Sequence, residues 1–342
     1  MEMNDEWSRE LPAAGLPSIP HWSENYAWNA YDPVSKVSLF LSIGRWSLDP
    51  AMWREFIGVC IGGITYSRRN IGRLHDPKIV GACCLQIECV QPLKRWHLRY
   101  HGPALQGTTE SLLLGQPDDT VCSLLDFELD WDAGSSPLID FGHGTESTGA
   151  TNAVPDPMSS HYEQGGIAAG SFTVDGVRHD FNAHSMRDHS RGPRQHKSSF
   201  GRHSWINAHF PSGRSIASLT LERPDKTMAM AALFAADKNR VVSKYQFDEI
   251  LLWESWEGRH DPYVLNASNE RGEKIRIEAV PIVSYPQSIA HPSDVYVGQS
   301  NHFEGWRIFE MPTRMVWDGE ETCGWTEISF TPEKSRKHPG KT

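Results

Sequence analysis

The sequence has no apolar run long enough to cross a membrane. Its longest uninterrupted apolar stretch, Met228 to Ala236, is nine residues, whereas a transmembrane helix needs roughly 20. The first residues, Met1 to Glu6, are acidic and lack the basic and then apolar profile of a secretory signal. We therefore expect no membrane span and a cytoplasmic location.

Basic residues are also in deficit. The chain carries 33 Lys and Arg against 43 Asp and Glu, which gives a formal net charge of −10. This balance supplies no positive field that would attract a polyphosphate, so nucleic acid is not an expected partner. The 342 residues are nevertheless 39% hydrophobic and include 13 Trp, enough to bury the cores of two domains.

The usual cofactor and metal motifs are missing. The sequence has no Gly-x-Gly-x-x-Gly or Gly-x-x-x-x-Gly-Lys-Ser/Thr run for nucleotides and no Gly-x-Ser-x-Gly nucleophile elbow. Its six cysteines form no Cys-x-x-Cys pair, which favours reduced core cysteines over disulfides or a zinc site. His179, His184 and His189 are evenly spaced, but neither a strand nor a helix brings residues at that spacing onto one ion. We expect chemistry without a metal or a cofactor.

The clearest pattern in the sequence is an alternation of apolar and polar residues with a period of two. Apolar and charged residues alternate from Leu125 to Trp131 and from Arg95 to His101, which is the pattern of half-buried strands. Asp175-Gly176 suits a type I′ turn between two strand-like runs. A helix is expected near Pro50 to Val59, with proline at its first position, and the run from Thr227 to Ala236 fits either a helix or, preferably, a hairpin strand. Many short strands at this spacing predict an all-β fold of barrels or sandwiches.

Composition divides the chain into two β domains and two tails. The segment 145–160 is rich in Gly, Ser, Thr and Pro and has almost no apolar run, so it is the predicted boundary. The polar, proline-containing ends predict poorly ordered tails. The two domains are expected to pack together, with these limits: tail 1–20, N-terminal domain 21–160, C-terminal domain 161–330 and tail 331–342.

The densest chemistry follows the Asp175-Gly176 turn. The 31 residues from His179 to His209 hold six of the sixteen histidines and four arginines. Gly192-Pro193 does not continue a strand ladder comfortably, so the residues before it are expected to present side chains at a barrel mouth. Asp188 and His189 offer a carboxylate and an imidazole, a pair suited to proton transfer. The same residues also fit an ion-pair network that merely holds a loop.

An aromatic segment near the start is the second region of interest. Tyr26 and Trp28 share one strand face with Glu24. Such a face can line an apolar cavity that holds one proton donor. An ordinary aromatic core strand would show the same pattern, so the residues alone leave both interpretations open.

The run from Met186 to Arg194 resembles the Asp-His-x-Trp-Gly signature of the hydroxyneurosporene synthase (carotenoid 1,2-hydratase)-like and AttH-like proteins. The resemblance extends to the opening segment 22–26 and to the closing hairpin segment 312–319, and it spans roughly residues 21–330. It implies two lipocalin-like β domains and a cavity for an extended apolar molecule such as an isoprenoid, a steroid or a polycyclic compound. Within the signature, His189 takes the histidine position, Asp188 the preceding carboxylate and Gly192 the glycine.

The chain departs from the signature at one position that affects the chemistry. Arg191 stands where the family has tryptophan. A guanidinium opposes a carbocation and instead favours an enolate, a carboxylate or a phenolate. The family's downstream Tyr-x-Asp pair is also absent near residues 216–218. Both departures favour a smaller oxygenated substrate over a carotenoid.

The sequence thus predicts a cofactor-independent lyase, hydratase or isomerase acting on a small apolar, oxygenated substrate. His189 is the expected general base or acid, Asp188 its orienting partner and Arg191 the group that stabilises negative charge. The expected substrate-binding residues are Glu24, Tyr26, Trp28, His203 and Trp205. The alternative is a non-catalytic, lipocalin-type binding protein for a lipophilic ligand. Neither interpretation fixes the oligomeric state.

Overall fold

The computed structural model describes most of the chain. The described residues are 5–13, 22–46, 49–74, 76, 78–113, 118–139, 160–193, 202–222, 227–234, 241–247, 261–269, 271–291, 294–297 and 306–330. The predicted boundary segment 145–160 and the predicted tail 331–342 lie outside them, except for Ser160.

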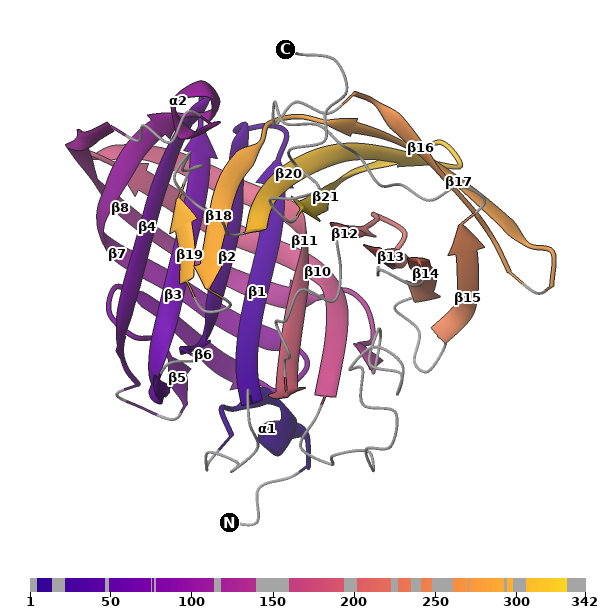
Figure 1. Cartoon of the computed structure of the whole chain (residues 1–342), viewed down its shortest axis with the longest axis horizontal. Helices are drawn as coiled ribbons and strands as arrows, with labels where there is room; N and C mark the ends of the chain where they lie inside the picture. The colour runs from indigo at the N-terminus through magenta and orange to yellow at the C-terminus, as the bar shows by residue number, and fades with distance from the viewer. Residues whose placement is uncertain are drawn as a thin grey trace.

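The first sheet closes into a barrel that fills one half of the molecule (Figure 1). Its strands are antiparallel and follow the order β4-β3-β2-β1-β11-β10-β8-β7-β6-β5, and β4 pairs with β7 to close the ring. The bounds are β1 Trp22–Asp32, β2 Val37–Trp46, β3 Asp49–Ile61, β4 Ile64–Arg73, β5 Ile79–Val80, β6 Leu85–Gln91, β7 Arg95–Thr108, β8 Asp118–Ala133, β9 Leu138–Ile139, β10 Ser160–Val174 and β11 Val177–Pro193.

The second sheet forms another closed ring beside the first. Its order is β17-β16-β15-β14-β13-β12-β21-β20-β18-β19, and β17 pairs with β20. The bounds are β12 Arg202–His209, β13 Ser215–Glu222, β14 Thr227–Phe234, β15 Val241–Phe247, β16 Tyr263–Ser268, β17 Lys274–Pro281, β18 Tyr285–His291, β19 Asp294–Val297, β20 Trp306–Trp317 and β21 Glu320–Phe330. The prediction of two packed, lipocalin-like β barrels is confirmed.

Two short helices accompany the barrels. Helix α1 spans Asp5–Glu10 and α2 spans Thr109–Leu113. Neither approaches the length needed to cross a bilayer, and no helix within the described residues does so. The helix expected near Pro50 is instead part of strand β3. Its β-branched and aromatic residues pair with β2 and β4 on either side, and this pairing overrides a local helix signal.

The strand pairing corrects the expected division of the chain. Strands β10 and β11 hydrogen bond within the first sheet, between β1 and β8. The segment 160–193 therefore belongs to the N-terminal barrel, and so does the Asp188-His189 motif that was assigned to the C-terminal domain. The chain passes to the second barrel between β11 and β12. A sequence shows where strands begin and end, but not which strands become neighbours, so composition placed the boundary too early.

The expectation of a poorly ordered tail 1–20 is also wrong for part of its length. Residues 5–13 are described and α1 lies beneath the end of the first barrel, close to where β1 begins (Figure 1). Its last residue, Glu10, is fully buried, and the side chains of Trp7 and Leu11 pack against the barrel core. Burial of a terminal segment is a tertiary effect that its polar composition conceals.

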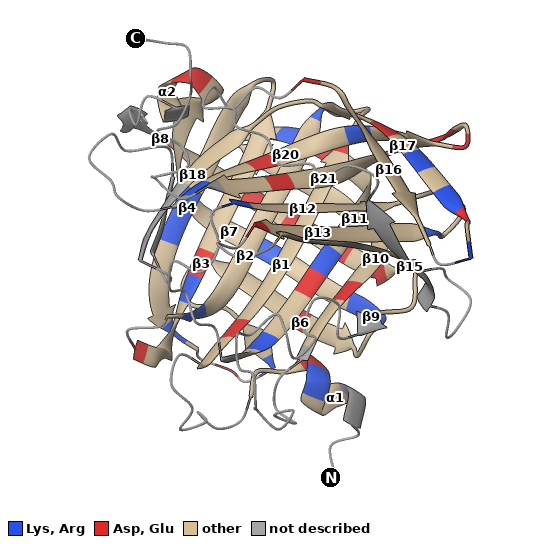
Figure 2. Ribbon diagram, turned by 45° about the vertical axis from the view of Figure 1, so that its right-hand side comes forward, with Lys and Arg blue, Asp and Glu red and all other residues tan. Residues whose placement is uncertain are grey.

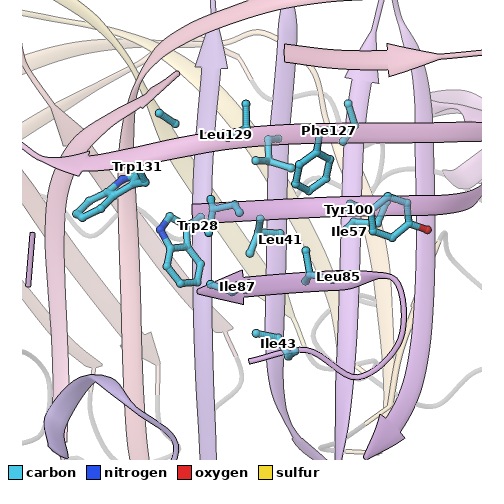
Figure 3. Close-up of a cluster of buried hydrophobic side chains, with 14 of the residues drawn as sticks. Trp28, Leu41, Ile43, Ile57, Leu85, Ile87, Tyr100, Phe127, Leu129 and Trp131 are labelled. Atoms are coloured by element: carbon cyan, nitrogen blue, oxygen red, sulfur yellow. The ribbon is translucent and has the colours of Figure 1, made fainter. Parts of the chain in front are cut away.

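The interior of the first barrel is filled with side chains. Buried aliphatic and aromatic residues from every wall form one continuous cluster, part of which is drawn in Figure 3. Trp28 from β1 contacts Trp96 from β7 edge to face, with ring centroids 5.4 Å apart. The same cluster includes Tyr100 and Phe127, whose rings stack with centroids 5.7 Å apart. Inward positions on each strand are therefore bulky, as the period of two predicts.

A smaller apolar cluster joins the two barrels. Trp325 of β21 is fully buried and stacks on Phe40 of β2, with centroids 5.8 Å apart, and on Tyr285 of β18 at 6.0 Å. Phe56 and Cys60 of β3 complete the cluster. Tyr285 also hydrogen bonds to Ser38 of β2. The junction therefore has an aromatic centre with interior-like packing.

We predict that Trp325→Ala weakens the junction and the fold together. Truncation of a fully buried tryptophan costs about 3–5 kcal/mol, and here it also leaves the buried Glu310 carboxyl without the indole N–H that donates to it at 2.6 Å. Urea unfolding followed by circular dichroism measures the loss. Val177→Ala, on an exposed side chain, is the control. An unchanged urea midpoint for Trp325→Ala would contradict the prediction.

Candidate functional site

Strand β11 carries the candidate motif, and its two faces look in different directions. Arg187, His189 and Arg191 alternate along the strand and are buried on the side that faces the barrel interior. Antiparallel pairing places His189 opposite Tyr26 of β1 on one side and opposite Tyr162 of β10 on the other. The sequence pattern therefore brings an imidazole and two phenols together at one level of the barrel.

His189 is completely enclosed by these neighbours. Its ring stacks on the Tyr26 ring with centroids 3.9 Å apart. Its Nδ1 lies 2.9 Å from the Tyr162 hydroxyl, and its Nε2 lies 3.4 Å from Oε1 of Glu24. The imidazole is fully buried. Its environment is aromatic and polar, and not the apolar cavity that the strand face of Glu24, Tyr26 and Trp28 could have lined.

Helix α1 supplies a second carboxylate to the same cluster. The Glu10 carboxylate accepts two hydrogen bonds from Arg187, at 3.0 Å from Nη1 and 2.9 Å from Nη2. It also accepts the hydroxyl proton of Tyr162. Arg187 donates further to Oε1 of Gln164 at 3.0 Å and 2.8 Å. This pair of fully buried charges connects the N-terminal segment to β10 and β11.

Glu24 of β1 is the carboxylate that faces His189. Two arginines hold it: Arg191 at 3.1 Å and Arg45 of β2 at 3.1 Å. The backbone N–H of Ala13 donates to it as well, at 3.1 Å. Glu24 therefore has charged partners within the barrel and a main-chain partner from the N-terminal segment.

The positive charges in this cluster lower the pKa of both of its carboxyl groups. Burial alone would raise the pKa of Glu24, but in the acid range contact with the protonated form of His189, together with Arg191 and Arg45, outweighs burial and lowers it to about 2. Glu10 behaves in the same way, because Arg187 overcomes the effect of burial and lowers its pKa. Burial lowers the pKa of His189, an effect that Glu24 opposes and Arg191 reinforces. Both carboxyls are therefore ionised at neutral pH and the imidazole is neutral.

The hydrogen-bond network assigns the tautomer of that neutral ring. Tyr162 has one proton, which it donates to the ionised Glu10 carboxylate. The Nδ1–H of His189 then donates to the Tyr162 oxygen, and Nε2 carries the lone pair. Among the described residues Nε2 has only long contacts, at 3.4 Å to Glu24 and 3.4 Å to Nη2 of Arg191. It is the basic nitrogen, and a proton taken up there would lie beside the Glu24 carboxylate.

Asp188 does not orient His189, which corrects the expected pairing. Consecutive residues of a strand point to opposite faces, and Asp188 points out of the barrel, where its Oδ2 lies 2.5 Å from Nε2 of His161. Glu163 lies on the same outer face of β10, and Trp205 of the second barrel donates to it at 2.8 Å. Burial, against an opposing contribution from His161, raises the pKa of Glu163 to about 8. Glu24 holds the position that the sequence assigned to Asp188.

The other predicted binding residues divide between the barrels. Glu24 and Tyr26 lie in the cluster around His189, and Trp28 is one strand period further into the core, stacked on Tyr26 at 6.4 Å. His203 instead pairs with Glu327 at 3.1 Å within the second barrel, and Trp205 contacts the outer face of β10. The structure does not bring these last two residues to His189.

Five members of the cluster were not selected from the sequence. Arg187 shares a strand face with His189, and this alternation could have identified it. Tyr162, Gln164 and Arg45 depend on strand register, which one sequence does not reveal. Glu10 depends on the docking of α1. In Figure 2 that helix shows both acidic and basic positions next to the barrel.

A second group of potential ligand atoms is already explained by local structure. Glu55, Cys83 and Cys84 place one ligand atom each within 4.8 Å of one another. The Glu55 carboxylate, however, accepts backbone N–H groups from residues 82–85 and the side-chain amide of Asn70. It therefore fixes the turn before β6. Among the described residues, no other His, Cys, Asp or Glu group has metal-binding spacing.

A family model described as a domain of unknown function (DUF7064) matches residues 8–332. The chain belongs to this family. No curated protein matches the DUF7064 chain in sequence.

Solved structures share the fold of the DUF7064 chain at low sequence identity. A candidate AttH protein from Nitrosomonas europaea is 13% identical, with a TM-score of 0.59 over 93% of this chain and 98% of that one. Kievitone hydratase from Nectria haematococca is 13% identical, with a TM-score of 0.50 over 90% and 88%. CghA, solved with Sch210972, is 11% identical, with a TM-score of 0.50 over 91% and 88%. These similarities fit an AttH-like fold and show the fold alone.

We predict that Glu24 contributes to an acid-sensitive part of the stability. Its pKa is lowered in the folded state, so the contribution is fully present above the ordinary carboxyl pKa of 4.5 and is lost as pH falls toward 2. The difference corresponds to about 3 kcal/mol. Urea unfolding from pH 6 to pH 2 should show a shallower acid dependence for Glu24→Gln than for wild type. Glu278→Gln, at an exposed side chain, should match wild type, and identical acid slopes in all three proteins would refute the assignment.

Proposed function

We propose that the chain is a cofactor-independent acid–base enzyme of the lyase, hydratase or isomerase type, acting on a small apolar molecule that carries oxygen. The observation that supports this most strongly is the neutral, fully buried His189, whose Nε2 lone pair lies among ionised partners. A general base must be unprotonated at working pH and must have a partner for the charge that it acquires. His189 meets both conditions.

The proposed roles follow from the contacts. Nε2 of His189 accepts a proton from substrate carbon or from water, and Glu24 stabilises the imidazolium that results. Arg191, 3.1 Å from Glu24, presents a permanent positive charge at the same point and stabilises an enolate or alkoxide as it forms. Tyr162 holds the Nδ1 side of the ring through its hydroxyl. Return of the proton from the imidazolium to a neighbouring carbon gives an isomerase. Its transfer to a departing hydroxyl releases water and gives a hydro-lyase, and the reverse steps add water.

The fold neighbours are compatible with this proposal. One of them is named as a kievitone hydratase, and CghA was solved with Sch210972. The same proposal includes two more specific expectations from the sequence. They are a hydroxyneurosporene synthase-like relationship and an isoprenoid, steroid or polycyclic substrate. The guanidinium of Arg191 favours the members of that set that pass through an anionic intermediate.

The binding-protein alternative is less favoured by the geometry. A carrier of an uncharged lipophile needs apolar cavity walls, whereas the groups around His189 include two carboxylates and three arginines. Buried ion pairs around a histidine also cost desolvation free energy that simple storage does not require. In a reaction that passes through a charged intermediate, these buried charged groups would stabilise that intermediate.

Isotope incorporation provides a direct test. The full chain is incubated in H₂¹⁸O and in D₂O with alkenes, enones and β-hydroxy ketones built on isoprenoid, steroid and polycyclic skeletons, and products are analysed by mass spectrometry. With at least one skeleton we expect deuterium at the carbon beside the oxygenated centre, ¹⁸O in a newly formed hydroxyl group, or both. Absence of enzyme-dependent label from all of them would contradict the proposal.

We predict that His189→Ala lowers kcat/KM by about 10²-fold or more, the size of a lost proton-transfer group. His101→Ala is the matched control, because His101 lies on the outside of β7 with a 72% exposed side chain. Circular dichroism of both variants checks that the barrels are folded. Equal kcat/KM for His189→Ala and wild type would remove His189 from the mechanism.

A further inference from the structure

The end of the first barrel is closed by a segment of the same chain. Residues 7–13 lie across it, and the barrel holds them largely through their backbone. Arg191 donates to the carbonyl oxygens of Ser8, Arg9 and Leu11 at 3.0, 2.8 and 2.8 Å. Tyr26 donates to the Glu10 carbonyl at 2.9 Å. These are residues of the proposed catalytic cluster, so the segment occupies the donors that a substrate would need.

The one side chain that this segment inserts into the cluster is a carboxylate. Within the described part of the chain, its hydrogen-bond donors are Arg187 and Tyr162, which belong to strands β11 and β10 of the barrel. The receiving groups are therefore present in the barrel without any contribution from α1. Arg187 is itself framed by three rings, with its Cζ 5.1 to 5.4 Å from the centroids of Trp96, Trp131 and Tyr162. Together they form a complete site for a carboxylate with aromatic walls.

Without the Glu10 carboxylate, the site has an excess of positive charge and should bind an anion strongly. In the cluster, Arg45, Arg187 and Arg191 oppose Glu10 and Glu24. Removal of the Glu10 carboxylate leaves three fixed cations against one carboxylate in a buried environment. A buried, uncompensated guanidinium is costly, so an incoming anion is favoured.

The apolar part of the segment indicates what else the ligand carries. Trp7 and Leu11 flank Glu10 and both pack on the barrel core. Their departure together with Glu10 would expose apolar surface directly beside the carboxylate site. The segment 7–13 thus has the chemistry of the molecule that could replace it: an aromatic or branched apolar group joined to a carboxylate.

We propose that the segment 7–13 is an exchangeable plug, and that its Glu10 occupies the binding site for an apolar carboxylate ligand of the first barrel. The ligand displaces the plug, its carboxylate pairs with Arg187 and Tyr162, and its apolar group lies where Trp7 and Leu11 lay. In placing that ligand beside His189 the inference rests on the proposed function. The plug acts as an intramolecular competitor, with an effective concentration in the millimolar range or higher.

Binding of 1-naphthaleneacetate tests the site, with 1-naphthaleneacetamide as the uncharged control. Isothermal titration compares full-length wild type, Glu10→Ala and Glu110→Ala, the last at an exposed position of α2. We expect Glu10→Ala to bind the acid at least tenfold more tightly than wild type and than it binds the amide, and Glu110→Ala to match wild type. Equal affinities of Glu10→Ala and wild type, or of acid and amide, would overturn the proposal.

Limited proteolysis of the unaltered chain tests the exchange and remains decisive if Glu10→Ala does not fold. The bond after Arg9 is a trypsin site whose carbonyl is held by Arg191. We expect the acid, and not the amide, to accelerate release of residues 1–9 at least fivefold, as measured by mass spectrometry. No acceleration with saturating acid would show that the segment is a fixed part of the barrel.

These measurements are independent of turnover. If the acid releases the plug but His189→Ala retains full activity in the isotope assay, the ligand site stands and the proposed proton transfer fails. If His189→Ala abolishes labelling but the acid neither binds nor releases the segment, the enzyme stands and its ligand enters by another route.

Discussion

Arg187 carries a permanent charge into the interior of a barrel that is otherwise filled with aromatic and aliphatic side chains. A fully buried guanidinium must have an anion and must satisfy its N–H groups. Glu10 and Gln164 meet this requirement, and because Glu10 comes from the N-terminal segment, it fixes α1 against the end of the barrel. The electrostatic demand of one inward side chain thereby determines how the start of the chain is placed and how His189 is enclosed.

The arrangement around His189 combines two features that ordinary barrel cores lack. Its neighbours are ionised groups held in place by several hydrogen bonds each, and the imidazole itself is uncharged. Catalysis by preorganised charges requires such an enclosure, in which the groups cannot relax toward water. The same enclosure blocks access of a substrate to His189. A movement of the plug that admits the substrate must therefore also keep the charges of the cluster balanced.

The sequence predicted those features that depend on local rules, such as strands and turns. It did not predict those that depend on which strands become neighbours and in which register they pair. Period-two alternation predicted the strands, and Asp175-Gly176 forms the expected turn, with φ of 47° and 87°. The same rule, applied to Asp188 and His189, already implies that they face opposite ways; the short motif obscured this. Glu24 could be predicted as an inward carboxylate of β1, but its position opposite β11 required strand register. Glu10 and Tyr162 could not be predicted, because docking of α1 and the pairing of β10 with β11 depend on the whole fold.

Strand β11 has unlike neighbours on its two sides. Its inward set, Arg187, His189 and Arg191, serves the barrel interior, and its outward set, which includes Met186 and Asp188, meets side chains near the second barrel. A register shift of one residue exchanges the two sets. Such a slip would bring a methionine and an aspartate into the charged cluster and turn its arginines toward the neighbouring barrel. Single-residue insertions or deletions in this strand should therefore be far more damaging than substitutions, and the spacing of β11 is constrained more tightly than its composition.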